Sequence, residues 1–268
     1  MACVAADPKR SSCSDSVSEA VDAEEETPLP ADFVKTLAEI DEADRDPDAS
    51  VSVVFNRLQD LLATHTEPRE QSELNWRVAR SIYCRATRFT SDADQKRDLL
   101  FEAHDFANKA YELTPNSAMA NIWCCITLGI LNDYVGVNKK IENGDKYKTH
   151  CLIALDLRPD DPMVHYLRGR FQYEISGLSW IERKVAKLFT GNEPQGTYTE
   201  ALERLQTAEQ LGVETMKECK FYIAQCYIAM GDKKCAAAAL QRALEEPPHV
   251  PHEFDLDDKI TKLMRKYH

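Results

Sequence analysis

Small residues recur at helical spacing along this chain, and each group ends at a proline or a glycine. The clearest example is residues 221–248, FYIAQCYIAMGDKKCAAAALQRALEEPP. Ala224 and Tyr227 lie three residues apart on a first predicted helix, and the Gly-Asp pair at 231–232 forms a turn. A second predicted helix carries alanines and leucines at the same spacing and ends at two prolines. The segment therefore predicts two antiparallel helices whose backbones approach closely where the side chains are small.

The second-helix pattern occurs three more times, as FEAHDFANKAYELTP (101–115), KYKTHCLIALDLRP (146–159) and YTEALERLQTAEQLG (198–212). The final alanines of the four copies, at 110, 154, 208 and 243, are separated by 44, 54 and 35 residues. A tetratricopeptide repeat has this pattern and a length of about 34 residues. We therefore predict an all-α, tetratricopeptide-like α-α superhelix, a solenoid with irregular insertions.

The domain organisation follows from this repeat. Residues 1–30 are rich in Ser, Ala, Asp, Glu and Pro and hold few large apolar side chains, so we expect a disordered acidic tail. Residues 31–268 are expected to form a single helical repeat domain. We place its repeats at about 70–115, 116–160, 161–212 and 213–248, with a C-terminal capping helix at 255–267.

Two insertions, residues 132–144 and 176–196, account for the long spacings. The second contains SWIERKVAKLF, in which Ile181, Val185, Leu188 and Phe189 share one helical face and the bases cluster on the other. One interpretation is a basic surface for an acidic partner. A second is an ordinary helix whose apolar side packs on the solenoid and whose cationic side is solvated. A membrane-surface helix is a third, disfavoured because three bases attract a membrane only modestly.

Charge is unevenly distributed. The chain carries a formal net charge of −12, of which residues 1–46, with thirteen acids and four bases, contribute −9. Residues 136–190 hold ten bases and seven acids, a net of +3. A nucleic-acid partner would require a stronger basic excess, so we expect none. No apolar run reaches the ~18 residues that span a bilayer, so no transmembrane anchor is expected.

Enzymatic chemistry has no sequence signal. There is no phosphate-binding G-x-x-x-x-G-K-[ST] loop, no dinucleotide-binding G-x-G-x-x-G, no H-E-x-x-H and no G-x-S-x-G. The cysteines and histidines are not arranged at metal-ligand spacing. We therefore predict a non-enzyme with no catalytic residues, no metal site and no cofactor.

A family resemblance is carried by ANIWCCITLG and by DDPMVHYLRGRFQYEISGLSWIERKVAKLF. These runs, over roughly residues 70–250, resemble the regulator of microtubule dynamics family. The shared landmarks are Trp123, Pro162-Met163, His165, Gly169-Arg170, Tyr173 and Leu178-Ser179-Trp180. The resemblance implies a tetratricopeptide-like protein associated with microtubules and the mitotic spindle. It implies a location in the cytoplasm and cytoskeleton, at spindles and spindle poles, and a role in spindle organisation and chromosome segregation.

The expected partner is therefore tubulin or the microtubule, bound directly or through another protein. The partner-binding residues that we predict form a basic, aromatic surface of the third repeat and its insertion: Arg168, Arg170, Tyr173, Trp180, Arg183, Lys184 and Lys187. The alternative is a lipid- or peptide-binding repeat domain that acts as an adaptor at organelle contacts. In that case the ligand would lie in the concave groove lined by the first helix of each repeat.

Overall fold

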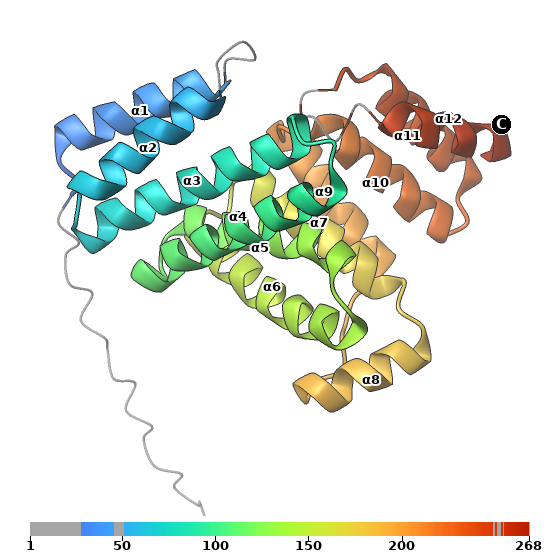
Figure 1. Cartoon of the computed structure of the whole chain (residues 1–268). Coiled ribbons are helices and arrows are strands. Elements are labelled where there is room, and N and C mark those ends of the chain that lie inside the picture. The colour runs from blue at the N-terminus through green and yellow to red at the C-terminus, as the bar shows by residue number, and fades with distance from the viewer. Residues whose placement is uncertain (1–27, 46–50, 249, 251–252, 254, 268) are drawn as a thin grey trace, which may run out of the picture.

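The computed structural model describes residues 28–45, 51–248, 250, 253 and 255–267 (Figure 1). Of the predicted tail at 1–30, residues 1–27 lie outside this range. Within it the chain forms twelve α-helices, the 3-10 turn η1 and no strand, so the all-α prediction is confirmed. The elements are α1 (Ala31–Arg45), α2 (Val51–Thr64), α3 (Pro68–Arg88), α4 (Ala93–Leu113), α5 (Ala118–Leu131), η1 (Asn132–Tyr134), α6 (Val137–Leu157), α7 (Pro162–Ser176), α8 (Trp180–Thr190), α9 (Tyr198–Leu211), α10 (Met216–Ala229), α11 (Lys233–Glu245) and α12 (Leu256–Tyr267).

Four helix pairs make the body of the molecule: α3 with α4, α5 with α6, α7 with α9, and α10 with α11. Each second helix turns a row of fully buried small residues toward its partner, and three of these rows follow the alanines that define the repeat pattern. Between α7 and α9 the approach is so close that Gly169 is required. A Cβ atom added at Gly169 would lie 2.7 Å from Leu205 Cγ and 3.1 Å from the Ala201 carbonyl oxygen.

Local capping explains where many of the helices begin. Asp92, Ser117 and Asp161 each accept a hydrogen bond from a backbone N–H in the first turn of the helix that follows. Ser179 and Thr197 complete capping boxes with a glutamate three residues later. The first insertion, residues 132–144, does not form a loop: it becomes η1 and the first turns of α6, which runs for 21 residues.

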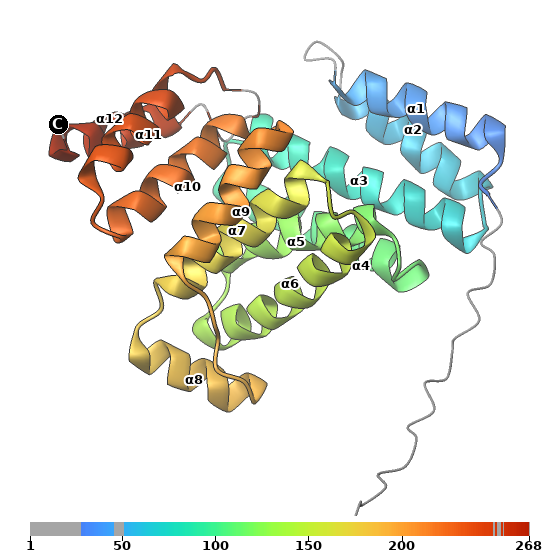
Figure 2. The same cartoon turned by 180° about the vertical axis from the view of Figure 1, so that it is seen from behind.

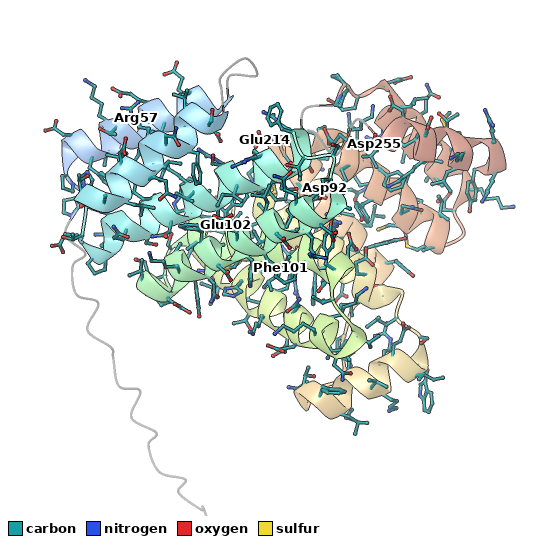
Figure 3. The ribbon with its side chains drawn as sticks, viewed as in Figure 1. Arg57, Asp92, Phe101, Glu102, Glu214 and Asp255 are labelled. Atoms are coloured by element: carbon teal, nitrogen blue, oxygen red, sulfur yellow. The ribbon has the colours of Figure 1, made fainter. Side chains whose placement is uncertain are left out.

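The repeats curl so far that the first returns toward the last. Burial, with smaller contributions from charges that include Glu214, raises the pKa of the Cys84 thiol near the end of α3 to about 11. Glu214 itself lies in the turn between α9 and α10 (Figure 3). Burial, reinforced by Glu218 of α10, raises the pKa of Tyr83 to about 12. The inner side of the superhelix is therefore narrow where α3, α7 and α10 face one another.

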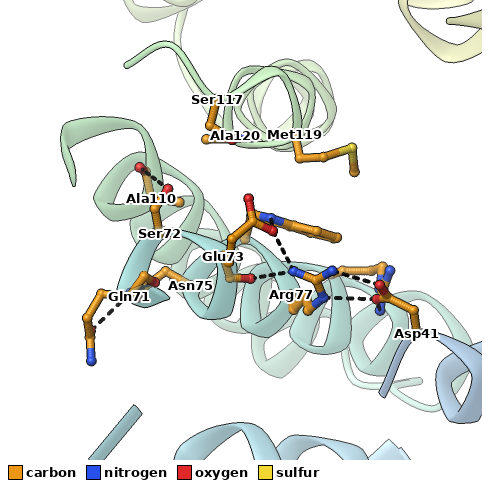
Figure 4. Close-up of polar contacts among 12 residues, drawn as sticks. Asp41, Gln71, Ser72, Glu73, Asn75, Arg77, Ala110, Ser117, Met119 and Ala120 are labelled. Carbon is orange, nitrogen blue, oxygen red and sulfur yellow. Dashed lines mark hydrogen bonds and ion pairs between the residues drawn. The ribbon is translucent and has the colours of Figure 1, made fainter. Parts of the chain in front are cut away.

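The N-terminal pair, α1 and α2, is attached to α3 by ion pairs as well as by apolar packing. The Arg77 guanidinium donates two hydrogen bonds to the Asp41 carboxylate, at 3.0 and 2.7 Å, and a third to Glu73 Oε2 at 2.7 Å (Figure 4). Arg80 bridges Asp41 and Asp44. At the other end, α12 packs on α11 and buries Leu256 and Ile260.

Candidate functional site: the projecting helix α8 and the concave face

Helix α8 stands apart from the paired helices. It is inserted between α7 and α9, and both views show it at the edge of the molecule beside the beginning of α6 (Figures 1 and 2). The capping box of Ser179 and Glu182 starts it, and Gly191, at a φ of 76°, ends it. Glycine suits that position because the left-handed conformation is costly for residues with a Cβ atom. The helix is therefore a defined element with fixed ends.

Arg183 holds α8 against the body. Its guanidinium donates to the carbonyl oxygens of Ile175 and Ser176, at 2.8 and 3.2 Å, and to that of Pro194 at 2.7 Å. A fourth, weaker bond reaches the Leu178 carbonyl oxygen at 3.3 Å. Ile175 and Ser176 end α7, where backbone carbonyls have no partner within the helix. Arg183 thus donates hydrogen bonds to the carbonyl oxygens at the end of α7 and thereby fixes the position of α8.

The orientation that results places the apolar side chains outward. Leu188 is 85% exposed, Trp180 71%, Ile181 67% and Phe189 59%, whereas Ala186 is buried. The interpretation in which the apolar side packs on the solenoid is therefore wrong. The inward stripe is formed by Arg183, Ala186 and the partly buried Thr190.

The remaining cations of α8 are Lys184 and Lys187, and both are about half exposed. Their Nζ atoms lie 3.5 and 3.9 Å from Glu193 Oε2, in the loop after the helix. Exposed pairs of this kind contribute only about 0–1 kcal/mol, so a partner can displace Glu193. Lys184 Nζ also lies 5.8 Å from the centroid of the Trp180 ring. Trp180, Lys184 and Lys187 therefore form one accessible group.

Two further predicted residues, Arg170 and Tyr173, lie elsewhere, on the face of α7 that meets α10. The Tyr166 hydroxyl donates to Glu218 Oε2 at 2.6 Å, and Arg170 Nη1 lies 3.5 Å from Glu218 Oε1. The Arg170 guanidinium also lies over the Tyr222 ring, at 5.2 Å from its centroid. We call Tyr166, Arg170, Tyr173, Glu218 and Tyr222 the concave cluster. Most of its polar groups bond to one another, and 40% of the Arg170 side chain is exposed.

Arg168 belongs to neither group. It is partly buried, and its guanidinium carbon lies 5.8 Å from the ring centroid of Phe171. The seven predicted residues thus divide between α8, the concave cluster and structural positions. Sequence reasoning did not identify Ile181, Leu188 and Phe189 as an accessible surface. A usable signal is the i, i+3, i+7 spacing of Arg183, Ala186 and Thr190, which marks the narrow stripe that packs inward.

Comparison with known proteins identifies the family. The sequence pattern of the family described as "Regulator of microtubule dynamics protein 1-3" matches residues 36–268. The chain belongs to this family.

Relatives in the regulator of microtubule dynamics family cover much of the chain. Regulator of microtubule dynamics protein 1 of Bos taurus is 30% identical over 211 residues, 79% of this chain and 66% of its own length. The Mus musculus protein 1 is 30% identical over 208 residues, 78% of this chain and 68% of its own length. Protein 2 of Homo sapiens is 29% identical over 206 residues, 76% of this chain and 50% of its own length. This chain therefore spans about two thirds of the first two relatives and half of the third.

A solved structure supports the architecture of this family member. A thermophilic TPR protein of Thermus thermophilus superimposes with a TM-score of 0.52 over 87% of this chain and 98% of its own length. At 15% identity this likeness shows the fold alone, and it confirms the tetratricopeptide-like prediction. In the part of the chain that the structure describes, no helix combines the length and apolarity that crossing a bilayer needs.

Proposed function

We propose that this chain is a non-catalytic regulator of microtubule dynamics that binds the polymer, or a protein on it, through α8. The observation that carries the proposal is the accessible group of Trp180, Lys184 and Lys187 on a helix fixed at the edge of the solenoid. Family membership supplies the connection to microtubules, because its members are named regulators of microtubule dynamics. The role that we propose is in spindle organisation and chromosome segregation, at the spindle and its poles.

Charge explains why such a group suits tubulin. The surface and tails of tubulin are acidic, and opposite charges speed encounter while salt weakens the bound state. Lys184 and Lys187 are exposed on α8, and Lys140 and Lys148 are exposed on α6, whose beginning lies beside α8 (Figure 1). Arg183 does not contribute, since its donors are occupied by carbonyl oxygens. The binding surface that we propose is therefore smaller than the predicted one.

The test is co-sedimentation with stabilised microtubules across a salt series. The variant Lys184→Glu/Lys187→Glu leaves Arg183 in place, so α8 stays attached to the body. We expect salt-sensitive binding by the natural chain and a loss of at least tenfold in the variant. Lys233→Glu/Lys234→Glu, on exposed lysines of α11, is the matched control and should bind normally. Equal binding by the natural chain and the α8 variant would refute the assignment of this surface.

The concave cluster supports a second candidate, capture of an extended peptide. The Arg170 side chain is 40% exposed and lies beside tyrosine side chains. A polar, aromatic lining of this kind suits a peptide better than a lipid chain. A separate cavity of about 280 Å³ lies between the beginning of α3, the turn between α4 and α5 and the end of α6, and most of its lining residues are polar. Arg170→Gln should weaken binding of acidic peptides, measured by fluorescence anisotropy, and leave α8-dependent sedimentation unchanged. Unaltered peptide binding would exclude the groove.

A further inference from the structure

Most of the apolar side of α8 is exposed, although Val185 is partly buried. Ile181, Val185 and Leu188 lie at i, i+4 and i+7, so they form one row along the helix. Leu188, at 85%, is the most exposed of the large apolar side chains in the described part of the chain. Trp180 and Phe189 flank the row at its two ends. Charge attraction to tubulin does not account for this row, since acidic tails offer no apolar surface.

The row faces outward because the structure holds it there. The four carbonyl contacts of Arg183 and the burial of Ala186 fix the opposite side of the helix on the body. Rotation that would bury Leu188 would break these four hydrogen bonds, and the Ile175 carbonyl oxygen would keep only backbone donors such as the Leu178 N–H, at 3.3 Å. The outward orientation of the apolar row is therefore a feature of the folded chain.

Two lysines and a tryptophan lie next to the apolar row. Lys184 and Lys187 flank it on one side, and their flexible stems allow the ammonium groups to reach away from apolar surroundings. The acidic residue on the helix, Glu182, is folded back onto Ser179, where its Oε2 accepts from the backbone N–H at 2.7 Å and from the hydroxyl at 2.6 Å. The Glu182 carboxylate therefore lies at the helix N-terminus. Trp180 stands at the boundary between the apolar and the cationic sides.

We propose that α8 is an interfacial helix that inserts its apolar row into the surface of an anionic phospholipid membrane. A helix of this kind lies in the plane of the interface, with apolar residues below the headgroups and lysines among the phosphates. Tryptophan favours the headgroup level. The projecting position of α8 allows it to meet a flat surface without collision of the paired helices (Figures 1 and 2). Bases alone disfavour a membrane-surface helix, but the outward apolar side chains add a hydrophobic attraction that the bases lack. This inference does not rest on the microtubule proposal.

Intrinsic fluorescence gives a direct test, because the chain contains three tryptophans and the other two, Trp76 and Trp123, are 3% and 7% exposed. The full chain is titrated with vesicles of phosphatidylcholine alone and of phosphatidylcholine mixed with phosphatidylserine. We expect a blue shift of Trp180 emission and protection from an aqueous quencher with the anionic vesicles only. Trp180→Phe should remove the shift.

Three variants decide whether the apolar row is responsible. Ile181→Ser/Leu188→Ser should weaken vesicle partitioning by about tenfold for each side chain removed. Val53→Ser/Phe89→Ser removes two comparably exposed apolar side chains from other elements and should leave partitioning unchanged. Lys184→Gln/Lys187→Gln should reduce the preference for anionic vesicles. All these side chains are exposed, so unfolding does not confuse the result, and circular dichroism verifies this.

The outcomes separate cleanly. Absence of vesicle binding by the natural chain overturns the inference, as does equal partitioning of the Ile181→Ser/Leu188→Ser variant. A partner protein with an apolar groove would then be the occupant to seek. Microtubule co-sedimentation of the same Ile181→Ser/Leu188→Ser variant should be unchanged, because the lysines are intact. Failure of the membrane inference and failure of the microtubule proposal are therefore distinguishable.

Discussion

Gly169 offers the sharpest test of the packing between α7 and α9. In the interior of an exposed helix, replacing glycine by alanine stabilises by about 0.5–1 kcal/mol, because alanine loses less conformational freedom on folding. At Gly169 the added methyl would meet Leu205 Cγ at 2.7 Å and two backbone atoms, Leu205 N at 3.0 Å and the Ala201 carbonyl oxygen at 3.1 Å. Leu205 is fully buried, so its side chain has no free space to enter.

Relief of these contacts requires α7 and α9 to move apart. Overpacking of this kind costs about 1–3 kcal/mol, and the upper half applies because backbone atoms are involved. After the gain in helix propensity, Gly169→Ala should lower the free energy of unfolding by about 1–2.5 kcal/mol. For a chain of this size the melting temperature should fall by about 2–10 °C, since each kcal/mol shifts it by about 2–4 °C.

The matched control is Gly144→Ala, within α6, where an added methyl meets nothing within 4 Å. It should raise the free energy of unfolding by about 0.5–1 kcal/mol. Both are measured by urea denaturation and by thermal melting followed by circular dichroism in the helical band. If Gly169→Ala melts at or above the natural chain, the close approach of α7 and α9 is not the constraint that the geometry indicates.

Three further perturbations test other parts of the molecule. Burial lowers the pKa of His150 to about 4 from the usual ~6.5, so its contribution to stability is complete above pH ~6.5 and is lost as the pH falls toward 4. The loss of unfolding free energy should approach ~3 kcal/mol at low pH. The variant His150→Gln should therefore show a smaller difference between the urea midpoints at about pH 7.5 and about pH 5 than the natural chain. An unchanged difference would contradict the reasoning. Asp41→Asn should destabilise the attachment of α1 and α2 by about 2 kcal/mol, because Arg77 loses its bidentate carboxylate at a site where its side chain is only 8% exposed. The rate of amide hydrogen exchange should rise first in these two helices. An equal rise along the whole chain would refute this. Arg183→Gln should free α8 and make residues 177–197 the first site of limited proteolysis; a cleavage pattern like that of the natural chain would show that other contacts suffice to hold the helix.

Much of the architecture is readable from the sequence because the repeat is built from local rules. Alanines at i, i+3 and i+4 mark the faces of closest approach, and the capping residues Ser117, Asp161 and Thr197 stand directly before the helices that they start. Gly144, at the end of the first insertion, lies within α6 rather than in a loop. It is tolerated in α6, where the cost of a glycine is about 1 kcal/mol and twenty other residues support the helix.

Long-range polar contacts are the part that sequence reasoning could not supply. Arg77 lies 36 residues from Asp41, and Tyr166 lies 52 residues from Glu218. No periodicity connects these positions, because the contacts exist only after the superhelix has curled. Arg170 and Tyr173 were therefore predicted together with the residues of α8, although they belong to a different surface.

The orientation of α8 shows how such a contact overrides amphipathicity. A hydrophobic stripe normally identifies the buried side of a helix. Here the partly buried end of the preceding helix presents carbonyl oxygens to Arg183, and an arginine guanidinium, with five N–H donors, can bond several of them at once. Burying Leu188 instead would gain about 1.5–3 kcal/mol, whereas each hydrogen bond that the charged guanidinium would lose contributes a similar amount. Because Arg183 makes four such bonds, the polar contacts outweigh the apolar ones, so α8 turns its apolar row toward whatever meets the molecule from outside.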